Sequence, residues 1–248
     1  KIREKMMARS AKGDIRWVLC EFPTESAAEG AKMSLKDYET FIAKGCFISK
    51  KDPMAAWKDL SKTQEKIVRF LNKKSDFRFV GPKTDIQFST KKRIWINSDG
   101  KRNMPSGEVF TSPVEDSVSG TIYFSYPSRY FGKPVEGVTL EVKDGKVMSW
   151  TAKKGKAVLD EVFSIPGARY FGEVAIGTNP YIQEAIGSTL FDEKIGGSIH
   201  MAIGASYPET GGKNKSSVHW DLITNMKKGG EIYADGELIY KNGAFICF

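Results

Sequence analysis

The sequence predicts a protein of mixed class, α/β plus α+β, in which a helix-rich part precedes a strand-rich part. Apolar residues recur at helical spacing up to about residue 72, and beyond it they alternate as in strands, separated by Asp-Gly turn pairs. The 248 residues suffice for one large domain or two modest ones. We therefore expect residues 1–75 to be the remnant of an N-terminal α/β domain and residues 76–248 to form a strand-rich α+β domain.

The first expected strand is the apolar run Trp17–Cys20, which a proline at position 23 follows, as at the end of a buried strand. Ser34 is expected to cap a helix that runs to Cys46, because Asp37 lies three residues after it and completes a capping box. This first part of the chain thus reads as an α/β unit.

A second helix is predicted to begin at Asp52-Pro53. The aspartate can accept first-turn N–H bonds, and proline at the first helical position loses none. Apolar residues such as Ile67 and Leu71 then recur at helical spacing, with lysines and Glu65 between them. We expect this helix to end near Asn72.

Beyond residue 75 the alternation of apolar and polar residues predicts strands over 77–79, 85–88 and 93–96. Asp99-Gly100, Asp144-Gly145 and Asp235-Gly236 are two-residue turn signals, because both central positions of such a turn need positive φ. The second and third pairs predict hairpins, 139–142 with 146–150 and 231–233 with 237–239. Two further helices are expected near 156–163 and 181–190.

Composition narrows the classes of protein that this sequence can encode. Hydrophobic residues at 40% and charged residues at 27% are ordinary globular values, which argue against a disordered or fibrous chain. No stretch approaches 18 apolar residues and no leader-like segment opens the chain, so neither a membrane span nor secretion is indicated. Cys20, Cys46 and Cys247 lack metal-ligand spacing and predict reduced thiols in the cytoplasm.

The net charge of +8 is unevenly distributed. Residues 1–103 contain 24 basic and 13 acidic side chains, whereas the rest of the chain contains 14 and 17. A basic segment is compatible with a non-catalytic nucleic-acid-binding module, which is the alternative function that the sequence leaves open. The lysines alternate with acidic and apolar residues, however, and this pattern favours solvated helix faces over a nucleic-acid surface.

The two histidines lie in strand-like segments of the acidic part. His219 and Asp221 are two residues apart within 217–223, so they should project from the same face of a strand, about 6.5–7 Å apart at Cα, and reach one metal ion. His200 lies in the strand-like segment 198–203, and Tyr207 follows it by seven residues. Gly211-Gly212 separates the two segments and allows their strands to approach closely.

Two carboxylates lie in unusual surroundings. Glu108 opens a strand directly after a tight turn, and Glu173 stands among apolar residues, where burial is costly without a cation. With the histidines and Asp221 they form a mixed N/O set that suits zinc, cobalt or manganese, with room for two ions that share a carboxylate. Ordinary interpretations remain open at this point: hydrogen-bonded core histidines, pairing of Glu173 with Arg169, and a Glu108 that only ends a turn.

Several long motifs resemble the thermophilic metallo-aminopeptidases of the aminopeptidase T and aminopeptidase S type. The resemblance covers nearly the whole chain, and its motifs are too long to be a chance match. The motifs lie at Trp95–Pro113, Phe191–His200, Tyr207–Lys215 and Val218–Asp221.

The resemblance implies a cytoplasmic, homodimeric exopeptidase that acts on peptides with a free N-terminus and uses two divalent metal ions. It implies zinc or cobalt, with manganese or magnesium as alternatives, and neither a nucleic-acid nor a membrane partner. Glu173 would be the bridging carboxylate, and Glu193 would lie behind the ligands rather than among them. The implied ligands are Glu108, Glu173, His200, Tyr207, His219 and Asp221.

The expected mechanism follows from these assignments. Two metal ions would lower the pKa of a shared water and polarise the scissile carbonyl. Since both histidines would be ligands, Glu108 is the expected general base, and Tyr207 would ligate or donate a hydrogen bond to the tetrahedral intermediate. Family members have a longer N-terminal α/β domain, so an inactive truncated peptidase is a further alternative.

Overall fold

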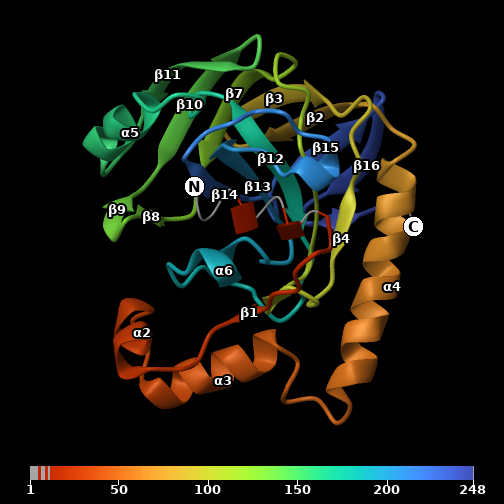
Figure 1. Ribbon diagram of the computed structural model, residues 1–248, viewed down its shortest axis with the longest axis vertical. Helices are drawn as coiled ribbons and strands as arrows, with labels where there is room; N and C mark the ends of the chain where they lie inside the picture. Colours follow the sequence, from red (N-terminus) through yellow and green to blue (C-terminus); the bar gives the residue numbers. More distant parts are fainter. Residues whose placement is uncertain (1–4, 7–8, 11, 248) are drawn as a thin grey trace.

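Two antiparallel sheets packed face to face form the larger part of the molecule, and helices lie along one side and at one end of it (Figure 1). The computed structural model describes residues 5–6, 9–10 and 12–247. The predicted combination of a few helices with a larger strand-rich part is confirmed. The assignment of residues 1–75 to the remnant of a separate domain stays a prediction.

The larger sheet has eight strands, and all its neighbouring pairs are antiparallel. Asp144-Gly145 and Asp235-Gly236 join two of these pairs with φ values of 50°, 80°, 49° and 81°, so both predicted hairpins are confirmed. In spatial order the strands are β11 (Lys146–Thr151), β10 (Val138–Lys143), β7 (Ser119–Phe124), β3 (Thr84–Ser89), β2 (Asp76–Gly81), β15 (Glu231–Ala234), β16 (Glu237–Lys241) and β17 (Ala244–Phe245).

The smaller sheet has five strands, which are also antiparallel throughout. Its order is β14 (His219–Asn225), β13 (Ser198–Gly204), β12 (Phe171–Gly177), β6 (Glu108–Thr111) and β4 (Ile96–Ser98). Two short pairs accompany it: β1 (Leu19–Cys20) is parallel to β5 (Asn103–Met104), and β8 (Ser128–Tyr130) is antiparallel to β9 (Lys133–Val135). A 3₁₀ turn, η1, covers Pro208–Thr210.

One hydrophobic core fills the space between the two sheets. Phe79, Ile122 and Leu140 of the larger sheet and Ile176 and Ile199 of the smaller one are fully buried in the same cluster. Each of these side chains contributes about 1.5–3 kcal/mol of burial free energy, so this contact dominates the stability of the strand-rich part.

The helices begin where the sequence provides capping side chains. Ser34 and Asp52 each accept a backbone N–H of the first turn, at 3.1 and 2.9 Å, so both predicted N-caps are confirmed. The predicted helix over 156–163 is also confirmed. The helices are α2 (Glu25–Gly30), α3 (Leu35–Gly45), α4 (Pro53–Leu71), α5 (Lys156–Phe163) and α6 (Thr189–Asp192).

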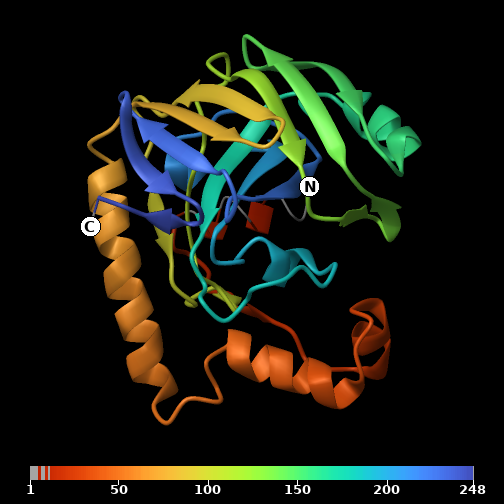
Figure 2. The same cartoon turned by 180° about the vertical axis from the view of Figure 1, so that it is seen from behind.

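The helices pack in two groups. The buried residues Ile67, Val68 and Leu71 of α4 belong to the core between the sheets, although α4 precedes residue 75. Helices α2 and α3 instead form a second cluster, in which Tyr38 and Ile42 are buried together with residues 182–195. This second layer lies at the lower end of the molecule in Figures 1 and 2.

A buried glutamine helps to fix α4 to the smaller sheet. The side-chain amide of Gln64 donates to the carbonyl oxygens of Ser98 and Glu108, at 3.0 and 2.9 Å, and to the side chain of Asn97. Its own oxygen accepts a hydrogen bond from Thr178 Oγ1 at 3.0 Å. Gln64 therefore links α4 to strands β4 and β6 and to the end of β12.

Three sequence-based expectations are wrong in part. Only two residues of the run Trp17–Cys20 form a strand, and Val18 and Leu19 are 67% and 52% exposed, because β1 pairs with the short β5 and no second layer covers it. The helix expected over 181–190 is reduced to α6. Gly187 adopts a φ of +79°, and Asp192 binds the N–H groups of Ile186 and Gly187, which prevents a continuous helix.

The third expected strand, over 93–96, begins later than predicted, at Ile96, and runs to Ser98. Asp99-Gly100 does not close a hairpin, since β4 pairs with β6 and β5 pairs with β1. No described helix combines the length and apolarity that crossing a bilayer requires.

The cap of α4 gives a test of this local account. Asp52→Ala removes the acceptor of the Ala55 N–H and should lower the free energy of unfolding by about 1 kcal/mol, measured by urea denaturation. Asp59→Ala is the control, since Asp59 is an exposed residue of the same helix and its loss should change stability by less than about 0.5 kcal/mol. Equal effects of the two substitutions would contradict the capping role.

Candidate metal centre

The pleat of the five-stranded sheet separates apolar from charged residues. On β13, Ile199, Met201 and Ile203 point into the core between the sheets, so His200 and Ala202 must point to the opposite face. Strand β14 repeats this alternation, with Trp220 and Leu222 in the core and His219 and Asp221 on the opposite face.

The two central acids reach the same face by the same rule. On β12, Val174 and Ile176 belong to the core, which leaves Glu173 on the opposite face. On β6, Val109 is in the core and Glu108 is not. Glu108, Glu173, His200 and Asp221 are all buried, and the side chain of His219 is only 10% exposed. Four separate strands therefore deliver these side chains to one place.

The register of the sheet provides room between the acids. Ala202 pairs with Glu173 on one side and with Asp221 on the other, so it stands between the two carboxylates on the same face. Similarly, His200 pairs with Ala175, and His219 pairs with Gly204. Because Ala202, Ala175 and Gly204 carry small side chains or none, they take up little of the space between the charged side chains.

Glu173 lies between the two histidines. Its Oε1 is 3.6 Å from His200 Nε2, and its Oε2 is 3.3 Å from His219 Nε2. Glu108 Oε2 is 3.5 Å from His200 Nε2, while Asp221 Oδ1 is 3.8 Å from His219 Nε2 and 3.9 Å from His200 Nε2. The predicted ligands thus form two groups that share Glu173, namely Glu108–Glu173–His200 and Glu173–His219–Asp221.

These separations fit a shared cation. Zinc ligands lie about 2.0–2.2 Å from the ion, so two ligand atoms of one tetrahedral site are about 3.3–3.6 Å apart. The five N···O distances between 3.3 and 3.9 Å match this spacing better than the 2.7–3.2 Å of ordinary hydrogen bonds. Within each group, the potential ligand atoms all lie within 4.8 Å of one another.

Several of the buried polar atoms lack a partner. Glu108 Oε2, Asp221 Oδ1 and His200 Nδ1 make no hydrogen bond within the part of the chain that the structure describes. A buried carboxylate oxygen without a partner costs free energy, and a bound cation would remove this cost. The residues present therefore fit a site for divalent metal ions.

Without metal ions, protons on the imidazoles balance the charge of the carboxylates. Burial alone would lower the pKa of His200, but contact with Glu173 and the charges of Glu108 and Asp221 raise that pKa to about 9. Burial opposes the same change at His219, where Asp221 and Glu173 raise the pKa to about 10. For Glu173 burial favours the neutral acid, yet the two imidazoles lower its pKa to about 2.

His219 is held with one ring nitrogen facing the carboxylates. Its Nδ1 lies 2.8 Å from the carbonyl oxygen of Ala205, an acceptor that requires a proton on Nδ1. A Cβ at Gly172 would overlap that same carbonyl oxygen, so glycine is needed for its close approach. In the neutral imidazole, Nε2 is therefore left free to bind a cation, with a tautomer fixed by the protein.

Tyr207 lies at the edge of the two groups rather than within them. Its hydroxyl is 3.1 Å from His219 Nε2, and burial together with Glu173 and the neighbouring carboxylates raises its pKa well above the usual range. The loop after Tyr207 is anchored by the buried Arg93, which donates to the carbonyl oxygen of Gly211 and pairs with Glu115 at 2.6 Å. The Tyr207 ring itself packs edge-on against Phe110 and His219.

The sequence did not single out Lys194, although this residue belongs to the cluster. Its ammonium is 2.5 Å from Glu108 Oε1 and also contacts Glu193, and its side chain is 1% exposed. Burial alone would lower the pKa of Lys194, but the two carboxylates raise it. A lysine next to a glutamate usually marks a solvated turn, and no signal in the sequence shows that this turn folds inward.

The alternative pairing of Glu173 with Arg169 is wrong, because Arg169 binds the Phe163 carbonyl oxygen and lies over Trp150.

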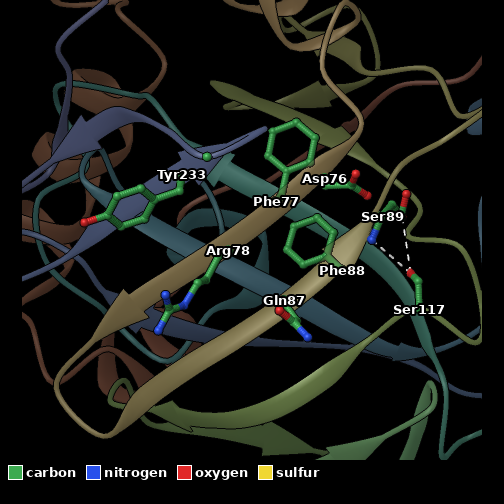
Figure 3. Close-up of a pocket in the computed structure, with 9 residues that line it drawn as sticks. Asp76, Phe77, Arg78, Gln87, Phe88, Ser89, Ser117 and Tyr233 are labelled. Atoms are coloured by element: carbon green, nitrogen blue, oxygen red, sulfur yellow. Dashed lines mark hydrogen bonds between the residues drawn. The ribbon is translucent and has the colours of Figure 1, made fainter.

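A cavity of about 610 Å³ lies elsewhere, on the larger sheet (Figure 3). It is formed by β2, β3 and the side chain of Tyr233, with Arg78 and Gln87 projecting from neighbouring strands. None of the carboxylate and histidine residues of the candidate metal centre lines it. The candidate metal centre on the smaller sheet is therefore separate from this cavity.

Curated aminopeptidases are similar in sequence to this chain. Aminopeptidase PepS of Streptococcus thermophilus is 33% identical over 93% of this chain and 63% of its own length. Aminopeptidase T of Thermus aquaticus is 31% identical over 77% of this chain and 52% of its own length. The chain thus spans between about half and two thirds of the length of these relatives.

Solved structures show the same fold. Wild-type AmpT from Thermus thermophilus superimposes with a TM-score of 0.71 and 28% identity, over 78% of this chain and 56% of that one. A dihydroxypyridine dioxygenase from Pseudomonas putida, at 19% identity and a TM-score of 0.61, shares the fold alone over 73% of this chain and 58% of its own. The family model described as Thermophilic metalloprotease (M29) matches residues 1–245, and this chain therefore belongs to that metalloprotease family.

Proposed function

We propose that this chain carries the metal centre of an aminopeptidase that removes residues from peptides with a free N-terminus. The position of Glu173 between His200 and His219 is the observation that carries the proposal, because one carboxylate with an imidazole at each oxygen suits a pair of ions. The family is one of metalloproteases, which implies a divalent metal cofactor. That there are two ions is part of the proposal.

We assign the ligands as two sets that share Glu173. Glu108 and His200 would complete one set, and His219 and Asp221 the other, with Tyr207 adjacent to His219. Such ions supply a water of lowered pKa and a Lewis acid for the scissile carbonyl. The mixed nitrogen and oxygen donors suit zinc or cobalt, and manganese or magnesium are the alternatives.

The side chains of the chain itself have three further roles in this mechanism. Glu108 is the proposed general base, since both imidazoles serve as ligands; its Oε2 would be both a ligand atom and, when it is not bound to an ion, the acceptor of the proton. The Tyr207 hydroxyl can ligate or donate a hydrogen bond to the oxygen of the tetrahedral intermediate. The concentration of buried carboxylates favours a substrate amine, which accounts for action at a free N-terminus rather than within a peptide.

Other functions gain less support. The relatives are named aminopeptidases, and none of them favours a nucleic-acid-binding module. The alternative of an inactive peptidase would retain the ligands without turnover, and the chain spans only about half to two thirds of the length of its relatives. The homodimer, the cytoplasmic location and the identity of the metal rest on the resemblance and stay predictions.

Replacing the bridging carboxylate tests this function directly. Glu173→Gln should reduce bound metal, measured by elemental analysis, and lower kcat/KM for an amino-acid nitroanilide by more than about 100-fold. Loss of a residue that only hydrogen-bonds to a metal ligand already lowers metal affinity or activity by about 10- to 100-fold. Chelator should abolish the wild-type activity, and zinc or cobalt should restore it. Glu141→Gln is the control, because Glu141 is an exposed acid of the larger sheet.

Full metal content and turnover in Glu173→Gln would contradict the bridging role. Metal bound to the wild-type chain without any turnover would instead identify the inactive truncated peptidase. Binding to nucleic acid that weakens with salt and does not respond to chelator would favour the nucleic-acid-binding module.

The raised pKa values of His200 and His219 predict how stability depends on pH. A histidine whose pKa is raised from 6.5 to about 9 or 10 stabilises the fold fully below pH 6.5, and this contribution is lost as the pH rises through the higher value. In chelator, the free energy of unfolding should therefore fall between pH 6.5 and about 10. With zinc bound the protons are already displaced, so the decline should disappear, and a chelated protein without it would contradict the assignment.

The small residue between the acids gives an independent test. Ala202→Leu should fill the space between Glu173 and Asp221, lower metal content and reduce the free energy of unfolding by about 1–3 kcal/mol. Met201→Leu is the control, since its side chain points into the core and the swap conserves volume; metal content should be unchanged. Unaltered metal binding in Ala202→Leu would show that ions do not occupy this space.

A further inference from the structure

The contacts of Lys194 suggest a role for this residue at the proposed metal centre. The residue lies between α6 and β13, and its backbone is anchored at both ends: its N–H donates to the Phe191 carbonyl oxygen, and its own carbonyl oxygen accepts the N–H of Asn179, both at 3.0 Å. The Asn179 side chain in turn donates to the carbonyl oxygens of Gly45 and Ser106. Hydrogen bonds of the backbone therefore hold the Lys194 main chain in place, independently of the charge of its side chain.

The ammonium has carboxylates as its partners. Lys194 Nζ is 2.5 Å from Glu108 Oε1 and also donates to Glu193 Oε1, and none of these three side chains is more than 11% exposed. An ammonium in such surroundings is tolerated only when it is paired and hydrogen-bonded, and here it is paired twice. This geometry makes Lys194 a fixed support and not a mobile surface charge.

The first consequence concerns Glu108. The terminal torsion of a glutamate is broad, so an unrestrained carboxylate can present one oxygen or both to a cation. With Oε1 bound to Lys194, only Oε2 is left, and it is this atom that faces His200 Nε2 at 3.5 Å without a hydrogen-bond partner among the described residues. Glu108 is therefore restricted to a single free oxygen.

The second consequence concerns Glu193. This acid forms a third potential ligand group with His200 and Asp221, whose ligand atoms lie within 4.8 Å of one another. Both of those residues already belong to the two groups that share Glu173. Glu193 is thus placed to compete for the same ions, and its contact with Lys194 occupies one of its oxygens.

We propose that Lys194 is a positioning residue that determines which carboxylate oxygens reach the metal ions: it limits Glu108 to one oxygen and holds Glu193 out of the coordination sphere. The inference rests on the function proposed above. Lys194 has its effect through Glu108 and Glu193, and the cluster gives it no direct role in the reaction.

Cobalt-loaded protein provides the test, because the visible absorption of Co²⁺ depends on the number and arrangement of its ligands. Lys194→Met keeps the length of the side chain and removes its charge. We expect it to bind cobalt with a weaker visible band, as extra carboxylate oxygens enter the coordination sphere. Its kcat should fall 10- to 100-fold, the cost of losing an outer partner, with little change in KM.

The double variant Glu193→Gln/Lys194→Met separates the two roles and covers the case in which the single variant fails to fold. It removes the competing carboxylate together with the ammonium, so part of the wild-type spectrum and kcat should return. Lys227→Met is the matched control, because Lys227 is a partly buried lysine that binds Gln183 away from the cluster. Its cobalt spectrum should equal that of the wild type.

A wild-type cobalt spectrum and kcat in Lys194→Met would overturn the inference. If only the double variant folds, complete rather than partial return of both would overturn it, because Glu108 still lacks its contact with Lys194 there. Loss of kcat with an unchanged spectrum would also overturn it, since this would indicate a merely structural role. If the wild-type protein binds cobalt but hydrolyses no peptide, the proposed function fails, and the spectra of the variants still decide the role of Lys194.

Discussion

The two-residue period of side chains along a strand is the constraint on which this molecule depends. On the five-stranded sheet it sends Ile199, Met201 and Leu222 into the core, and by the same geometry it sends His200 and Asp221 to the opposite face. Packing of the two sheets therefore determines where the charged residues converge. A shift of register by one residue would place the charges in the core and the apolar side chains outside, so stability and chemistry select the same register.

The unfavourable free energy in this arrangement is electrostatic. Buried acids concentrate negative charge on one face, and in the absence of cations the histidines and Lys194 are the groups that balance it. The same side chains whose burial is costly in a metal-free protein are the proposed ligands of a divalent ion, and binding would recover that cost. The proposal thus couples folding and metal binding through a small set of residues.

Local signals in the sequence predicted the parts of the fold that local chemistry determines. Asp52-Pro53 began a helix, and Asp144-Gly145 closed a hairpin, because caps and turns depend on neighbouring residues. The prediction of a buried strand over Trp17–Cys20 was wrong in part, because apolar composition does not reveal whether a second layer covers a strand. The helix expected over 181–190 failed because Asp192 satisfies the backbone of that segment in another way.

The candidate site was predicted to a similar degree and for similar reasons. His219 and Asp221 could be placed on one face from their spacing alone, whereas their proximity to Glu108 and Glu173 depends on the order of strands. The order was accessible only through the resemblance. Lys194 could not be found in either way, because its burial results from a turn that folds over the end of the sheet.

The buried amide of Gln64 has a consequence for how freely the surface of this protein can change. Its contacts reach the backbone of Glu108 and Ser98 and the side chain of Thr178, so one position of α4 sets the distance between this helix and the strand that bears a site acid. Among the described residues, the solvent-facing lysines of α4 and its exposed Asp59 make no such hydrogen bond with that strand. Substitutions on the outer side of the helix should therefore leave the site undisturbed. The surface charge and solubility of this face can change while the proposed chemistry is preserved.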